Sequence, residues 1–217
     1  MGTIQDVGEW IAQDYANILF ILLPNIILFI AVFFQGLDAG WVLLIYWAES
    51  AVVGVYNLLK MALARMEDGP PRVLSAFVKG FSMLFFLAHY GIFMGVHLLF
   101  LVTRLGVDVS NLTLATLAVP LLCVIAMFVA HGIEFFRSYV APQLFKRTQP
   151  FDLFFQPYKR VVIMQLAIIF GFLVLRWIGM AMLVAEVMVL LKMVVDMVLA
   201  WRRRVSRPSL RRRSSSP

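Results

Sequence analysis

Long apolar stretches limit most strongly what this chain can fold into. A helix needs about 20 mostly apolar residues to cross the hydrocarbon core of a bilayer. Stretches of this kind cover residues 16–34, 40–63, 80–102, 112–136 and 161–201. Arg176, Trp177 and Gly179 divide the last stretch into a short fifth helix and a sixth. We therefore predict an all-α polytopic membrane helix bundle with about six transmembrane helices.

The composition favours the same environment. Hydrophobic residues make up 62% of the chain and charged residues 14%, whereas soluble domains are roughly 45–50% apolar and about a quarter charged. A single water-soluble core cannot bury this much apolar surface. The only cysteine, Cys123, lies in an apolar stretch, so an intramolecular disulfide is impossible. A packing role is favoured for this thiol over a role as nucleophile or ligand.

The lysines and arginines gather on one side of the predicted bundle. They occupy the second-to-third and fourth-to-fifth connections and the segment after the sixth helix, apart from Arg104, Arg176 and Lys192. Cytoplasmic loops carry the excess of Lys and Arg, so both termini are predicted to be cytoplasmic. The same rule accounts for much of the net charge of +7, and no nucleic-acid partner is expected.

Three regions follow from this organisation. Residues 1–15 are predicted to be an interfacial helix or an extension of the first transmembrane helix. Residues 16–201 form the transmembrane domain, and 146–160 within it combine prolines, aromatic residues and cations, which suits the membrane interface. Residues 202–217 are rich in Arg, Ser and Pro, and we expect a disordered tail attracted to anionic lipid.

Ionisable side chains inside the predicted helices are the main candidates for function. Burying such a group costs at least about 2.5–3.5 kcal/mol, which makes each one a functional hypothesis by default. All three histidines of the chain belong to this set. Its members are Glu49, His89, His97, His131, Glu134, Glu186, Lys192 and Asp196.

The helical rise of about 1.5 Å per residue gives an expected depth for these groups. Glu49 and His97 fall in an outer layer and are predicted to pair if their helices are neighbours. An inner layer holds His131 and Glu134, which share one helix face at i, i+3, together with Gln165. His89 lies between the layers. The spacing i, i+4 of Lys192 and Asp196 favours an ion pair.

Several functions remain open for these polar residues. Each histidine can satisfy a backbone carbonyl or hydroxyl at a helix interface, which makes the protein a binding or structural module. Alternatively Glu49, His89, His97 and His131 are candidate ligands of a transition metal, and Glu49, His97 and His89 are candidate catalytic residues. Proton or ion transport is a third hypothesis.

Sequence motifs do not decide between these functions. The chain contains no HExxH, paired CxxC or GxSxG motif, and it shows no internal repeat of the kind that marks transporters. Whether the protein is an enzyme, and its oligomeric state, stay undetermined. Gly91 and Gly95 form a small-xxx-small pattern, from which we predict that the third helix is central and closely packed.

Three sequence blocks carry a resemblance to a known family. They are YWAES followed by VYNLLK, then HYGIFMGVH, then PYKRVVIM. Together they resemble a family of prokaryotic multi-pass membrane proteins known only as a domain of unknown function, over most of residues 40–175. The resemblance implies a location in the cytoplasmic membrane. It also implies Asn at the position of Ser50 and His at that of Gln165, so this chain lacks a polar group that an inner metal site would use.

Overall fold

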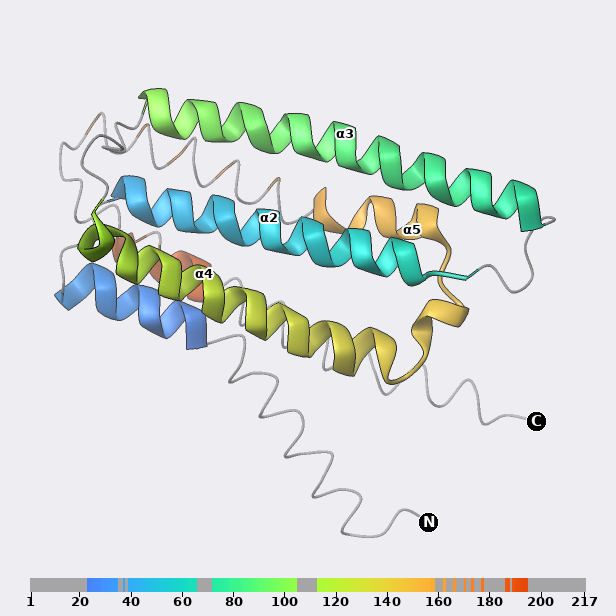
Figure 1. Ribbon diagram of the computed structural model, residues 1–217. Helices are drawn as coiled ribbons and strands as arrows, with labels where there is room; N and C mark the ends of the chain where they lie inside the picture. Colours follow the sequence, from blue (N-terminus) through green and yellow to red (C-terminus); the bar gives the residue numbers. More distant parts are fainter. Residues whose placement is uncertain are drawn as a thin grey trace, which may run out of the picture.

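Long apolar helices make up most of the described part of the chain (Figure 1). A first helix covers Leu23–Phe34. It is followed by α2, Ala39–Leu63, α3, Arg72–Arg104, and α4, Leu114–Phe135. A π-helix, Phe136–Val140, a 3-10 helix, Leu144–Lys146, and α5, Pro150–Phe154, come next. No strand occurs among the residues that the structure describes.

The structure is a computed structural model that describes most of the first 158 residues. These residues are 23–34, 37, 39–65, 72–104 and 113–158, and beyond them 162, 166, 170, 173, 177, 186, 187 and 189–194. The predictions for residues 1–15 and 202–217 lie outside the described residues. The predicted fifth helix is described only at separate positions, and the predicted sixth helix only at 186, 187 and 189–194.

Three described helices are long and apolar enough to cross a membrane. They cover Gly40–Leu63, Val73–Thr103 and Leu117–Val140, in agreement with the predicted second, third and fourth transmembrane helices. The third begins earlier than predicted, because residues 72–79 continue the helix although they include Arg72 and Lys79. The all-α prediction is confirmed for the described residues, whereas the count of six helices and the cytoplasmic termini stay predictions.

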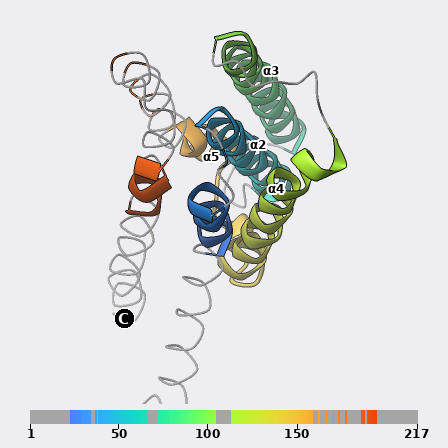
Figure 2. The same ribbon diagram turned by 90° about the vertical axis from the view of Figure 1, so that its left-hand side faces the viewer.

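The central helix of the described bundle is α2. It lies between α3 and α4 and also contacts α5 (Figures 1 and 2). In the most apolar window of α2 half of the residues are buried, against 28% for α3. The prediction that the third helix is central is therefore wrong. Apart from its chain neighbours and the backbone of its own helix, no described atom lies within 4 Å of a Cβ built on Gly91 or Gly95.

Close helix approach occurs instead at two other glycines. A Cβ on Gly54 of α2 would overlap Cε1 of Tyr90 on α3. A Cβ on Gly132 of α4 would lie 2.6 Å from the hydroxyl oxygen of Tyr56 on α2. The missing side chains thus make room for tyrosine rings that come from neighbouring helices.

Large side chains join these helices by donating hydrogen bonds to backbone carbonyls. Between α2 and α3, Trp47 Nε1 donates to the Met94 carbonyl at 2.8 Å and the Tyr90 hydroxyl donates to the Ser50 carbonyl at 2.7 Å. The Tyr56 hydroxyl of α2 donates to the Phe128 carbonyl of α4 at 2.9 Å. Such bonds and close packing are the main sources of helix association in lipid, where burial of apolar surface contributes little.

The end of α4 turns the chain back towards α2 and α3. The π-helix closes with the Ala141 N–H donating to the Phe136 carbonyl at 2.8 Å. Pro142 cannot donate a following hydrogen bond, and Gln143 has φ 54°, which ends the helical path. The Tyr139 hydroxyl fixes this end of α4 by donating to the Lys60 carbonyl of α2 at 2.9 Å.

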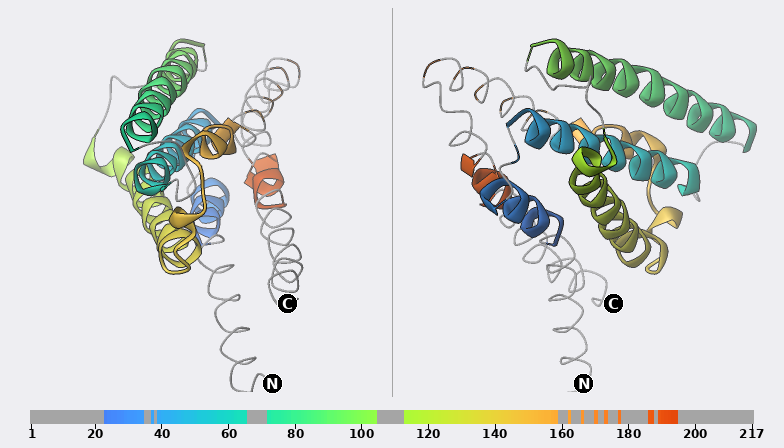
Figure 3. Two further views of the ribbon diagram at one scale, coloured as in Figure 1. Left: turned by 90° about the vertical axis from the view of Figure 1, so that its right-hand side faces the viewer. Right: turned by 60° about the vertical axis from the view of Figure 1, so that its left-hand side comes forward.

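The segment around α5 packs one face against the described bundle, and its predicted position at the membrane interface stays a prediction. Leu153 and Phe154 are buried, at 1% and 7% exposure, although Phe151 and Phe155 are exposed. α5 contacts both α2 and α3 and lies beside α2 (Figure 3). The hydropathy of 146–160 did not show this, because a helix can bury one face and expose the other.

Asn57 of α2 binds the backbone of this segment. Its Nδ2 donates to the Leu153 carbonyl at 3.0 Å. In a regular helix that carbonyl accepts the N–H of the residue four positions later, which here is Pro157 and has none. The side-chain amide of Asn57 therefore takes the place of the missing backbone donor.

Candidate functional site

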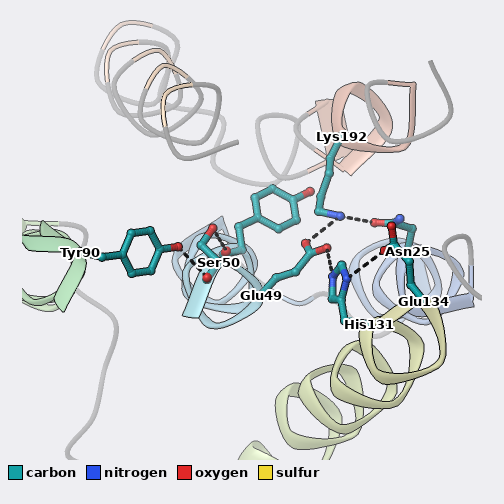
Figure 4. A network of polar contacts seen from close by, with 8 residues as sticks. Asn25, Glu49, Ser50, Tyr90, His131, Glu134 and Lys192 are labelled. Atoms are coloured by element: carbon teal, nitrogen blue, oxygen red, sulfur yellow. Dashed lines mark hydrogen bonds and ion pairs between the residues drawn. The ribbon is translucent and has the colours of Figure 1, made fainter. Parts of the chain in front are cut away.

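A cluster of polar side chains lies where four helical segments meet (Figure 4). Asn25 comes from the first helix, Glu49 from α2, His131 and Glu134 from α4, and Lys192 from the helical residues 189–194. Figure 4 shows the Lys192 and His131 side chains converging on the Glu49 carboxylate. We call these five residues the polar cluster.

The strongest contact of the polar cluster is an ion pair. Lys192 Nζ lies 2.9 Å from Oε2 of Glu49, with side-chain exposures of 13% and 8%. The same ammonium donates a hydrogen bond to Oδ1 of Asn25 at 2.7 Å, and Asn25 is 1% exposed. A buried charge must be paired and hydrogen-bonded to be tolerated. The pair meets this condition with groups from three helical segments.

His131 lies between two carboxylates. Its Nε2 is 3.5 Å from Oε1 of Glu49, and its Nδ1 is 3.5 Å from Oε2 of Glu134. These distances exceed the usual 2.7–3.2 Å of an N–H···O hydrogen bond. The contacts are therefore weaker than the ion pair to Lys192. The predicted neighbourhood of His131 and Glu134 on one face of the helix is confirmed.

Uncharged groups surround Glu49 on its own helix. The Lys192 ammonium lies 5.4 Å from the centroid of the Tyr46 ring, within cation–π range. The Ser50 hydroxyl donates to the Tyr46 carbonyl at 3.1 Å. The Ser50 carbonyl in turn accepts the Tyr90 hydroxyl, so the cluster is linked through α2 to α3 (Figure 4).

The predicted pair of Glu49 and His97 is not formed. The His97 ring is 7% exposed, and its Nδ1 donates to the Phe93 carbonyl of the same helix at 2.7 Å. Its Nε2 has no hydrogen-bond partner among the described residues. Trp47 and Ser50 face α3, and Glu49 lies about 100–160° away from them round α2. The depth estimate placed the two residues at one level but took no account of this rotation.

His89 lies apart from the polar cluster and from His97. It is exposed on α3, and its Nδ1 makes a short hydrogen bond with the Tyr158 hydroxyl. Two other predicted groups, Gln165 and Asp196, lie outside the described residues. Lys192, which was predicted to pair with Asp196, reaches Glu49 and Asn25. Glu186 is half-buried and takes no part in the polar cluster.

The candidate metal ligands are only partly brought together. Of Glu49, His89, His97 and His131, the structure places Glu49 and His131 side by side. Within the described residues no group of three or more His, Cys, Asp or Glu side chains is arranged to hold a metal ion. The Glu49 carboxylate faces a lysine ammonium, whose positive charge opposes the approach of a cation. Among the described residues, the four candidate ligands therefore do not form one site.

The sequence contained signals for the residues that the predicted site omitted. Asn25 follows Pro24 inside an apolar helix, where a polar amide needs a partner. Lys192 was one of the ionisable groups, but its partner was sought on its own helix. The pairing depends on how the last helix lies against the first two, which spacing within one helix cannot show.

Comparisons with known proteins identify the family but no activity. The chain matches the model of a family of unknown function, DUF6498, over residues 10–214. Neither the comparison with curated proteins nor the comparison with solved structures gave a match. The family agrees with the predicted kind of family, one without an assigned function. The chain therefore belongs to the family of unknown function DUF6498.

Proposed function

We propose that this chain is a multi-pass protein of the prokaryotic cell membrane, and that the polar cluster is the structural core of a helix-bundle binding module. Three described helices have the length and hydropathy for this location. Both termini are cytoplasmic in this proposal, and the basic segment 202–217 binds anionic lipid by charge. Alkaline carbonate extraction of cell membranes tests the location, because an integral protein stays in the pellet.

The buried ion pair of Lys192 and Glu49 carries the structural part of the proposal. It joins the first helix, α2 and a segment more than a hundred residues later in the chain. Removing one partner of a buried ion pair costs about 3–5 kcal/mol, because it leaves the other charge uncompensated. Replacing both partners with neutral groups of similar size costs far less. The polar cluster thus favours one arrangement of the helices.

Paired substitutions test this role. Glu49→Gln and Lys192→Met should each lower the free energy of unfolding in detergent by about 3–5 kcal/mol. The double variant should lose clearly less than the two single losses added together, because no buried charge is then left alone. Glu186→Gln is the matched control, with the same chemical change in a half-buried glutamate outside the polar cluster. Additive losses would contradict the proposal.

Proton handling is a second candidate function. The position of His131 between Glu49 and Glu134 favours it, because an imidazole can exchange a proton with either carboxylate. Proteoliposomes that contain a pH-sensitive dye would show proton uptake driven by a pH gradient, and His131→Asn should abolish it. Equal proton uptake by protein-free liposomes, by the natural chain and by His131→Asn would rule this function out.

The alternative of a metal-binding protein or enzyme has less support. Its four candidate ligands lie in three different places. Glu49 and His131 belong to the polar cluster, His97 is buried on α3, and His89 is exposed on α3. Elemental analysis of protein purified in detergent without added metal tests it directly. One transition-metal ion per chain would favour this alternative over the structural role.

A further inference from the structure

An exposed stripe of aromatic rings runs along α3. Phe77 and Phe81 stack with centroids 6.5 Å apart and ring planes 18° apart, and Phe81 and Phe85 stack at 6.1 Å and 16°. His89 continues the series against Phe85 at 5.8 Å and 12°. The spacing of four residues keeps all of these rings on one side of the helix. The result is a row of rings with nearly parallel planes that ends in a polar ring.

His89 lies at the middle of the helix that crosses the membrane. Val73 is about 24 Å from it along the axis and Thr103 about 21 Å, at 1.5 Å per residue. The side chain is exposed, and its Nδ1 is bonded to the Tyr158 hydroxyl. When that hydroxyl donates to Nδ1, the remaining proton of the neutral ring is on Nε2. No described residue accepts a hydrogen bond from this N–H.

An N–H that faces hydrocarbon without an acceptor costs several kcal/mol. At this depth the charged head groups and ester groups of phospholipids are too far away to supply one, and acyl chains contain no acceptor. Among the molecules of the membrane, a partner for His89 must therefore be soluble in the hydrocarbon core and must carry an uncharged acceptor. A flat ring would also stack against the aromatic row.

α5 adds a second aromatic wall beside this stripe. Phe154 is buried and stacks on Phe85 with centroids 5.4 Å apart, which fixes that ring from behind. Phe155 is exposed and lies 6.5 Å from the Tyr158 ring. The hydrogen-bonding pair of His89 and Tyr158 thus has aromatic rings on both α3 and α5.

We propose that this aromatic stripe binds the ring of a lipid-soluble quinone, with one quinone carbonyl accepting a hydrogen bond from Nε2 of His89. A quinone has the flat ring, the uncharged acceptor and the solubility in hydrocarbon that the stripe requires. The ring stacks on Phe81 and Phe85, and its tail follows the exposed apolar surface of α3. This inference rests on the proposed position of α3 across a membrane.

Photolabelling of the detergent-purified full chain tests the site. The probe is a short-chain azidoubiquinone, and the labelled peptides are identified by mass spectrometry. Label is expected on the peptides that carry Phe81–His89 and Phe155–Tyr158, and ubiquinone-1 should compete with it. His89→Phe keeps the stacked ring and removes the donor, so binding of ubiquinone-1 should weaken about tenfold, the effect of one hydrogen bond.

A control separates this effect from general loss of structure. Thr103→Val removes an exposed hydroxyl whose bond goes to the Leu99 carbonyl of its own helix, so quinone binding should not change. Tyr158→Phe leaves the ring and should weaken binding without changing the gel-filtration profile. Unchanged binding by both His89→Phe and Tyr158→Phe would overturn the inference.

Two further outcomes would also overturn it. Label spread evenly over the exposed apolar sides of α3 and α4 would show that the azidoubiquinone partitions into the detergent around the protein and does not bind at one site. Disulfide-linked dimers of a Phe85→Cys variant, formed equally with and without ubiquinone-1, would show that a second copy of the chain covers the stripe. Carbonate extraction tests the proposed membrane location separately from quinone binding. A protein that stays in the membrane pellet but does not bind quinone would contradict the quinone site alone.

Discussion

The replacement of a backbone donor by Asn57 makes a quantitative prediction. Asn57→Ala removes the 3.0 Å hydrogen bond to the Leu153 carbonyl in the interior of the bundle. A buried polar group that loses its partner costs about 1–3 kcal/mol. The N–H of Phe155 also points at this oxygen, so we expect the lower half of that range.

A second substitution should remove most of this cost. Pro157→Ala supplies the N–H that a regular helix directs to the Leu153 carbonyl. In that background Asn57→Ala should cost about 1 kcal/mol less than in the natural chain, since the carbonyl has its own backbone donor. The free energy of unfolding is measured for the four chains by SDS titration followed by circular dichroism.

The control is a proline that Asn57 does not serve. Pro120 lies inside α4, where the carbonyl four residues earlier belongs to Thr116. Pro120→Ala should leave the cost of Asn57→Ala unchanged. Equal costs of Asn57→Ala in the natural and the Pro157→Ala backgrounds would refute the reasoning, and the hydrogen bond would then be incidental to the shape of this segment.

Two other predictions concern packing and topology. Gly54→Ala should destabilise the protein by about 1–3 kcal/mol, because the new methyl group overlaps the ring of Tyr90. Gly91→Ala should be neutral or stabilising by up to about 1 kcal/mol. Thermal unfolding in detergent measures both, and an equal loss of stability in the two variants would place Gly91 against another helix. Reporter fusions after Val109 and after Trp201 should report opposite sides of the membrane, and signals from the same side would exclude six transmembrane helices.

Much of the helical architecture could be predicted from the sequence. The second helix was expected over 40–63 and occurs at Ala39–Leu63, because unbroken apolar runs define helices in lipid with little dependence on neighbours. The pairing of His131 with Glu134 was also predictable, since it is a property of one helix.

The contacts between helices were less predictable. Depth estimates paired Glu49 with His97, but the rotation of α2 directs Glu49 to His131 and Lys192. The glycine pattern at Gly91 and Gly95 indicated close packing, yet these residues are exposed on α3. The closely packed glycines are Gly54 and Gly132. Gly54 follows Ser50 at the same small-xxx-small spacing, so only its contact with the ring of Tyr90 on another helix distinguishes it from Gly91 and Gly95.

The hydrogen bonds between helices have a consequence for how the sequence can vary among relatives. In five of them a side chain is the donor and a backbone carbonyl is the acceptor. Every amino acid has a carbonyl, so the acceptor positions accept many substitutions, whereas each donor position needs an N–H or O–H at the right reach. The short sequence blocks that contain these donors can therefore be kept among relatives because they join the helices, even if the relatives share no catalytic activity. The donors are Trp47, Tyr56, Asn57, Tyr90 and Tyr139.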